Sequence, residues 1–81
     1  MPPVEITIDV TSPVFPYVQI ADQLRAAIRR GEIADVLPSL WEIANDAGVS
    51  YNTARRAVQI LKDEGLVEAF PGRGTFVKRR P

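Results

Sequence analysis

The feature that most constrains the fold of this chain is a pair of short helical patterns joined by Gly48-Val49-Ser50. Apolar residues recur at offsets of 0, 3, 4 and 7 from Leu40 before the tripeptide, and from Ala54 after it. Gly48 tolerates the positive φ that a tight turn requires, and Val49 offers an apolar side chain to the core. The spacing predicts two helices that cross at roughly 90 to 120° through a short turn, which is a helix-turn-helix motif.

The ends of these two helices also carry sequence signals. Ser39 is followed three residues later by Glu42, the capping-box spacing, so the first helix is predicted to begin there. Ser50 is an N-cap candidate for the second helix, which is predicted over residues 51–64. Helices joined by so short a turn approach closely, so small residues such as Ala44 are expected where they meet.

Two more segments are predicted before this pair. Residues 5–10 alternate between apolar and polar side chains, which predicts a strand with one buried face. Residues 11–16 include two prolines and are expected to form an extended lead-in. An apolar stripe of helical period over residues 17–28 predicts another helix, ended near Gly31. Residues 36–38 are too few for more than a strand fragment.

The C-terminal part predicts a β-hairpin, with strands at 66–70 and 75–78 around the turn Pro71-Gly72-Arg73-Gly74. The expected fold class is therefore mostly α with a small β-hairpin (α+β), a winged helix-turn-helix of three helices and a two- to three-stranded antiparallel wing. The expected divisions are an N-terminal strand and proline-rich lead-in at 1–16, the winged helix-turn-helix domain at 17–78, and a basic tail at 79–81.

Composition excludes several classes of function. The 81 residues include no Cys and no His, so disulfides, zinc fingers and hydrolytic triads are excluded, and neither a cofactor nor a metal is expected. The acidic residues lie without a base or nucleophile around them, so an enzyme is not expected. From this length, neither a separate ligand-sensing domain nor a small-molecule effector pocket is expected. No apolar run reaches ~18 residues and no signal peptide is evident, so a cytoplasmic chain without a membrane partner is expected.

The formal net charge of zero conceals a division between the two halves of the chain. Residues 1–50 contain three basic and seven acidic residues, which gives −4, whereas residues 51–81 contain seven basic and three acidic residues, which gives +4. Such asymmetry is typical of a chain with a nucleic-acid or other acidic partner. The total charge alone therefore does not argue against DNA.

The outward face of the second helix carries side chains that suit DNA. Arginine can bind guanine bidentately, and asparagine or glutamine can bind adenine, in the major groove. Hydroxyls and free N–H groups at a helix start suit phosphate, and an arginine between two glycines at a hairpin tip suits a phosphate or the minor groove. The candidates from this chemistry are Ser50, Tyr51, Asn52, Thr53, Arg55, Arg56, Gln59 and Arg73.

A series of motifs covers about residues 17–77 and includes the helix pair and the hairpin tip. They are Tyr17–Arg25, Leu37-Pro38-Ser39, Ala44, Gly48-Val49-Ser50, Asn52-Thr53, Arg55-Arg56-Ala57, Glu64-Gly65-Leu66-Val67 and Gly72-Arg73-Gly74-Thr75-Phe76-Val77. Together they resemble the N-terminal domain of GntR-family transcriptional regulators, and the hairpin motif is the most specific part. The resemblance implies a bacterial, dimeric winged helix that binds a palindromic operator, usually as a repressor, with Arg55, Arg73, Gly74 and Thr75 at DNA-contact positions.

The chain departs from this family at the starts of both helices. The family usually has Ser-Glu-Arg-Glu-Leu-Ala where this chain has Ser39-Leu40-Trp41-Glu42-Ile43-Ala44, so Trp41 replaces a basic contact, and Tyr51 stands where arginine is common. The loop at 32–36 is shorter, and at this length the C-terminal effector and dimerisation domain of the family is not expected. By position, Ser39 and Trp41 join the candidate DNA-binding residues. The two lost cations predict weaker phosphate attraction or an altered operator.

Several alternatives stay open. Trp41 either packs or forms a protein interface, or contacts phosphate or sugar through its indole N–H, and Tyr51 either contacts DNA or is simply exposed. The preferred function is a regulator that binds double-stranded DNA, as a homodimer through the first helix and N-terminal strand or as a monomer that pairs on DNA. The alternative is a winged-helix module for protein partners, anchored by Trp41, Tyr17 and Phe15, with weak DNA binding.

Overall fold

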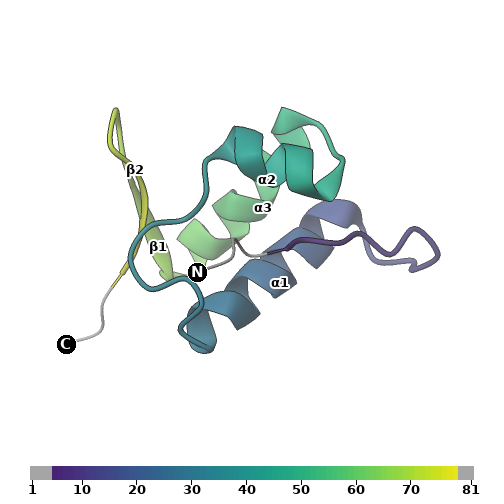
Figure 1. The fold of residues 1–81 in the computed structure, drawn as a ribbon, viewed down its shortest axis with the longest axis horizontal. Helices are drawn as coiled ribbons and strands as arrows, with labels where there is room; N and C mark the ends of the chain where they lie inside the picture. Colours follow the sequence, from purple (N-terminus) through teal and green to yellow (C-terminus); the bar gives the residue numbers. More distant parts are fainter. Residues whose placement is uncertain (1–4, 79–81) are drawn as a thin grey trace.

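The computed structural model describes residues 5–78 and contains three helices followed by a hairpin (Figure 1). The helices α1 and α3 pack against each other, α2 packs on α3, and the hairpin extends from one end of the helical body. This confirms the predicted fold class of three helices and an antiparallel wing. The elements are α1 (Pro16–Arg29), α2 (Leu40–Ala47), α3 (Tyr51–Asp63), β1 (Val67–Phe70) and β2 (Gly74–Val77).

Helix α1 begins one residue before its predicted start because Pro16 occupies the first helical position. Proline is favoured there, since its fixed φ suits a helix and its missing N–H has no intrahelical acceptor in any case. The predicted stripe is confirmed, with Ile20, Leu24 and Ala27 completely buried. The helix ends at Arg29. The positive charge of this side chain in the last turn interacts favourably with the negative end of the helix dipole.

The predicted caps of the helix-turn-helix are confirmed. The Ser39 hydroxyl accepts from the Glu42 N–H, and the Glu42 carboxylate accepts from the Ser39 N–H, which completes a capping box. Gly48 ends α2 in the left-handed conformation, at φ 71°, and Ser50 then caps α3. Val49 packs against the core as expected, although it is only partly buried.

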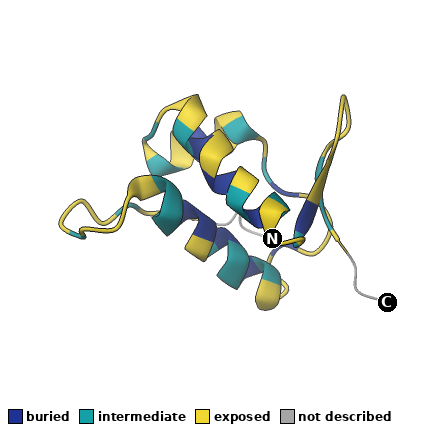
Figure 2. Cartoon of the chain, turned by 180° about the vertical axis from the view of Figure 1, so that it is seen from behind, coloured by how far each residue is buried: buried dark blue, intermediate teal, exposed yellow. Residues whose placement is uncertain are grey.

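A single apolar core lies between the three helices and the base of the hairpin (Figure 2). Each helix contributes its apolar stripe and keeps its charged side chains on the outside. Alanines stand where α2, α3 and α1 come together, as the close crossing requires. The buried residues are Ile6, Ile20, Ala21, Leu24, Ala27, Ile33, Leu37, Ile43, Ala44, Ala54, Ala57, Val58, Leu61 and Val67.

The wing is a two-stranded antiparallel sheet, in which Val67 pairs with Val77 and Phe70 pairs with Gly74. The loop before α2 adds a strand-like edge, because Val36 forms an isolated bridge with Phe76. Gly74 opens β2, so the turn is one residue shorter than predicted. The expected strand fragment at 36–38 thus takes the form of one bridge that ties the wing to the body.

The prediction of an N-terminal strand at residues 5–10 is wrong, because this segment pairs with no other strand within residues 5–78. The segment is extended beside α1 but pairs with side chains: Gln23 accepts from the Thr7 N–H and donates to its carbonyl, at 3.0 and 2.7 Å, and Gln19 accepts from the Asp9 N–H at 2.8 Å. Ile6 is buried, as alternation predicts, but Val10 is 89% exposed in a turn. The basic tail predicted at 79–81 lies outside the described residues.

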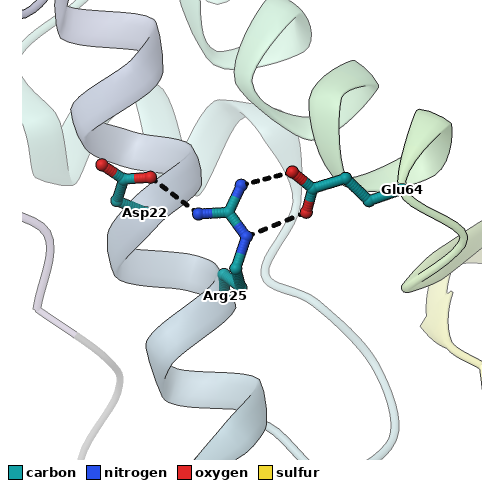
Figure 3. Close-up of polar contacts among 3 residues, drawn as sticks. All are labelled: Asp22, Arg25 and Glu64. Carbon is teal, nitrogen blue, oxygen red and sulfur yellow. Dashed lines mark hydrogen bonds and ion pairs between the residues drawn. The ribbon is translucent and has the colours of Figure 1, made fainter.

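One arginine fastens α1 to the end of α3 (Figure 3). The Arg25 guanidinium binds both carboxylate oxygens of Glu64, at 2.8 and 2.6 Å, and also Asp22 one turn before it, at 2.7 Å. These hydrogen bonds lower the pKa of Glu64 and raise that of Arg25. Arg25 and Glu64, which are 39 residues apart in the chain, thus form a bidentate link between α1 and the C-terminal cap of α3.

Candidate nucleic-acid interface

The outward face of α3 is polar, as the sequence predicts. Asn52, Arg55, Arg56 and Gln59 are all exposed. Arg55 makes no hydrogen bond or ion pair with any other residue of the described range 5–78. Its guanidinium, which is planar and carries five donors, is therefore available to a ligand.

Two candidates on the same face have partners within the chain. The Arg56 guanidinium lies 4.1 Å from the centroid of the Tyr17 ring, in cation–π geometry, so it leans from α3 toward the start of α1. Gln59 donates to the Asp63 carboxylate at 3.0 Å, one turn later in α3. The free groups of this face thus lie toward the N-terminal half of the helix.

The hydroxyls at the start of α3 serve the helix itself. Ser50 accepts from the Thr53 N–H at 3.1 Å, and the two hydroxyls are 3.0 Å apart. The first-turn N–H groups of Tyr51 and Asn52 have no acceptor within the helix. An anion at this end of α3 would therefore meet backbone donors and the positive end of the helix dipole.

The tip of the wing presents a cation on a tight turn. Arg73 is exposed, and its backbone N–H donates to the Phe70 carbonyl across the turn at 2.9 Å. Gly74 follows at φ 120°, a conformation that residues with a side chain rarely adopt. Thr75 is half-buried, and its carbonyl accepts from Leu37. Arg73 is thus held at the tip by the hairpin backbone, while its side chain has no hydrogen-bond or ion-pair partner among residues 5–78.

A groove of about 430 Å³ lies between the wing, the start of α2 and the start of α3. It brings together half of the candidate residues, from the two helices of the helix-turn-helix and from the wing. The candidates that line it are Ser39, Trp41, Tyr51, Arg73, Gly74 and Thr75. Glu42 also lines it, which sequence reasoning did not foresee; its place in the capping box was the available signal.

Two neighbouring aromatic rings form one wall of this groove. The ring centroids of Trp41 and Tyr51 lie 4.5 Å apart, at an interplanar angle of 42°. Trp41 is still 65% exposed and Tyr51 37% exposed. Trp41 thus packs on a ring without being buried. Phe15 stacks on Tyr17 instead, so the three aromatics of the protein-partner alternative belong to two different ring pairs.

The ion pairs of residues 5–78 do not include Arg55 of α3 or Arg73 of the wing. Within residues 5–78 the ion pairs are those of Arg25, with Asp22 and Glu64, and of Arg30 with Glu32. The separation of charge seen in the sequence therefore leaves uncompensated arginines on α3 and the wing.

The family of this chain follows from its sequence together with this geometry. The model of the family described as "Bacterial regulatory proteins, gntR family" matches residues 16–77, which span all three helices and both strands. The chain belongs to the GntR family. Within residues 5–78, no helix of this chain is long and apolar enough to cross a membrane.

Curated GntR-type relatives are transcriptional regulators by name. The chain is 41% identical over 76 residues to the HTH-type transcriptional repressor NagR of Bacillus subtilis, covering 91% of this chain and 31% of NagR. It is 41% identical over 64 residues to the repressor MngR of the mannosyl-D-glycerate transport/metabolism system of Escherichia coli, covering 76% of this chain and 27% of MngR. The chain thus spans less than a third of either relative.

Solved structures share the winged-helix fold. The DNA-binding domain of AraR in complex with operator ORX1 superposes with a TM-score of 0.81 at 27% identity, over 91% of this chain and 96% of that one. YtrA from Sulfolobus acidocaldarius, a GntR-family transcription factor, superposes with a TM-score of 0.83 at 37% identity, over 94% and 82%. Both agree with the fold described above.

Proposed function

We propose that this chain binds double-stranded DNA sequence-specifically as a transcriptional regulator, of the repressor type. The observation that carries the proposal is that Arg55, on the exposed face of α3, and Arg73, which lines the groove between the wing and the starts of α2 and α3, form no ion pair within residues 5–78. The superposition on an AraR domain bound to its operator supports it, as do the repressor names of NagR and MngR.

In this proposal α3 enters the major groove. Its N-terminal half carries Asn52 and Arg55, whose amide and guanidinium match the edges of adenine and guanine. The N–H groups at the start of α3, with the Ser50 and Thr53 hydroxyls beside them, face the phosphate backbone. The wing places Arg73 against the flanking phosphates or in the minor groove.

We further infer that two copies bind a palindromic operator. One recognition helix reads base edges with only three or four side chains, so a single copy specifies few base pairs. Two copies on two half-sites, one helical turn apart, read about twice as many. The proposal places the protein with the chromosome, in the cytoplasm.

The first test is the salt dependence of binding to a random-sequence duplex. If several phosphates are contacted, affinity falls steeply as salt rises, with a slope of about −0.9 per phosphate neutralised. A double variant, Arg55→Ala with Arg73→Ala, serves as a control and should have a shallower slope. No binding at low salt, or a flat response, would overturn the proposal.

The second test is selection of bound sequences from a random duplex pool. A regulator of this kind should enrich one motif, and a palindrome with half-sites about one helical turn apart would reveal the dimer. Enrichment of a single half-site would contradict pairing but not DNA binding. An unenriched pool would contradict sequence specificity.

A further inference from the structure

The two aromatic rings in the groove are an unusual feature of a surface proposed to meet a polyanion. Tyr51 is the first residue of α3, and Trp41 lies in the first turn of α2. Both stay accessible after they pack on each other, with Trp41 65% exposed and Tyr51 37% exposed. Neither the Tyr51 hydroxyl nor the Trp41 indole N–H has a hydrogen-bond partner within residues 5–78. The pair thus offers a neutral, mostly apolar surface at the DNA-facing end of α3.

A neutral ring suits one group in the major groove better than any other. Among the base edges displayed there, the C5-methyl of thymine is the apolar one, and it is read by apolar contact. Residues at the N-terminus of a recognition helix lie nearest the base edges, which is the place of Tyr51. A phosphate can accept a hydrogen bond from the Tyr51 hydroxyl or the Trp41 indole N–H. The rings carry no charge to neutralise a phosphate, however, so the apolar ring surface itself suits the methyl group.

The contact with Trp41 explains how such a reader could be held in place. A tyrosine at a helix start can adopt several rotamers, and each rotamer frozen on binding costs conformational entropy. The Trp41 ring, 4.5 Å away on a different helix, restricts that choice before DNA arrives. Trp41 is thus a positioning residue, and Tyr51 is the residue that touches the base.

We infer that Tyr51, held by Trp41, reads the 5-methyl group of a thymine in each operator half-site. The inference rests on the proposed function and adds a base preference to it. Burial of one methyl group corresponds to an affinity gain of about four-fold. The expected contribution is therefore small for each base pair, but it is specific to one position and to one atom group.

The test replaces single thymines with deoxyuracil in the selected operator, which removes only the 5-methyl group. For the wild-type protein, one position in each half-site should weaken binding by about four-fold. Tyr51→Ala should abolish that difference, and Trp41→Ala should reduce it. Tyr51→Phe is the matched control, because it keeps the ring and should keep the methyl effect. Thermal unfolding of each variant by circular dichroism separates loss of contact from loss of fold.

The outcomes separate this inference from the function on which it rests. A pool that yields no motif overturns the proposed function itself. A clear motif without a methyl effect at any thymine, or without a thymine near the start of α3, overturns only the reading by Tyr51. If Tyr51→Phe removes the methyl effect, or Tyr51→Ala keeps it, the Tyr51 ring does not contact the methyl group, and the inference is wrong.

Discussion

At the scale of single residues, Arg55 and Arg56 show how neighbours in the chain can differ in what they can do. Both are exposed on α3. Arg56 lies over the Tyr17 ring, whereas Arg55 has no partner within residues 5–78. Residue type and helical spacing predict both arginines on the outward face of α3. Only the contact of Arg56 with Tyr17 of α1 distinguishes them. The difference leads to separate expectations for the two arginines.

Replacing Arg55 with alanine should weaken binding to the selected operator by about 1–3 kcal/mol and relax the preference at one base pair. The reason is loss of a bidentate contact, which lysine cannot replace although it keeps the charge. Titrations by fluorescence anisotropy on the operator and its single-base variants measure both effects. Arg56→Ala is the control and should weaken all sequences alike. An unchanged preference in Arg55→Ala would remove Arg55 from base reading.

Gly48 is another single residue on which the motif depends. Its φ of 71° is in the left-handed region, and a Cβ added there would meet no atom within 4 Å. Gly48→Ala should therefore lower the free energy of unfolding through backbone conformation alone, by about 1–2 kcal/mol. Urea denaturation measures the loss. Gly48→Asn should lose less unfolding free energy, because asparagine tolerates the left-handed conformation better. A Gly48→Ala variant as stable as the wild type would contradict this explanation.

At the scale of elements, the sequence predicted all three helices to within about a residue at their starts, whereas the strand predicted at residues 5–10 does not form. The stripes and caps that define α1, α2 and α3 depend on residues within a few positions of each other. A strand needs a partner, and alternation over residues 5–10 does not identify one. The structure supplies Gln19 and Gln23 from α1 as partners, and their side-chain amides replace a neighbouring strand.

The wing is an element whose role can be separated from its fold. Its backbone is tied to the loop before α2, where Leu37 donates to Thr75 at 2.9 Å and Val77 donates to Asp35 at 2.8 Å. The Arg73 side chain takes no part in these bonds. Arg73→Ala should therefore leave thermal unfolding unchanged and reduce the salt slope of DNA binding by about 1.

Arg73→Lys is the matched control for that variant, since it preserves one positive charge and should restore most of the salt slope. Both measurements use a random-sequence duplex, so that base reading by α3 does not contribute. A wild-type slope in Arg73→Ala would show that the wing tip does not approach phosphate. A large fall in unfolding temperature would show instead that Arg73 supports the hairpin.

At the scale of the whole molecule, the ion pair between Arg25 of α1 and Glu64 at the end of α3 makes the free energy of unfolding depend on pH. The pKa of Glu64 is lowered from its ordinary value of 4.5, chiefly by the hydrogen bonds from Arg25. A carboxylate with a lowered pKa stabilises the fold above its unfolded pKa, and that contribution is lost as pH falls through the folded value. The loss therefore occurs below about pH 4.5.

We expect Glu64→Gln to be less stable than the wild type at pH 7, and the difference between the two proteins to shrink as pH falls from 4.5 toward 3. The difference should be at most about 1 kcal/mol, because the Glu64 side chain is 40% exposed and water screens the pair. Urea denaturation at pH 7 and at pH 3 measures it. Asp9 and Glu32, whose pKa values are also lowered, titrate in both proteins and cancel in the comparison. A difference in unfolding free energy that is as large at pH 3 as at pH 7 would assign it to packing instead of to the charge of Glu64.

The family, the three helices, their caps and the outward face of α3 could be predicted from the amino-acid sequence, because they depend on local spacing and on residue types. Which candidate residues meet depends on how the helices and the wing pack. Their packing brings Ser39, Trp41 and Tyr51 to one groove with the wing, and it occupies Arg56 with an α1 ring. Such contacts join elements far apart in the chain, and their partners are selected by how the helices pack around one core rather than by any periodicity along the sequence.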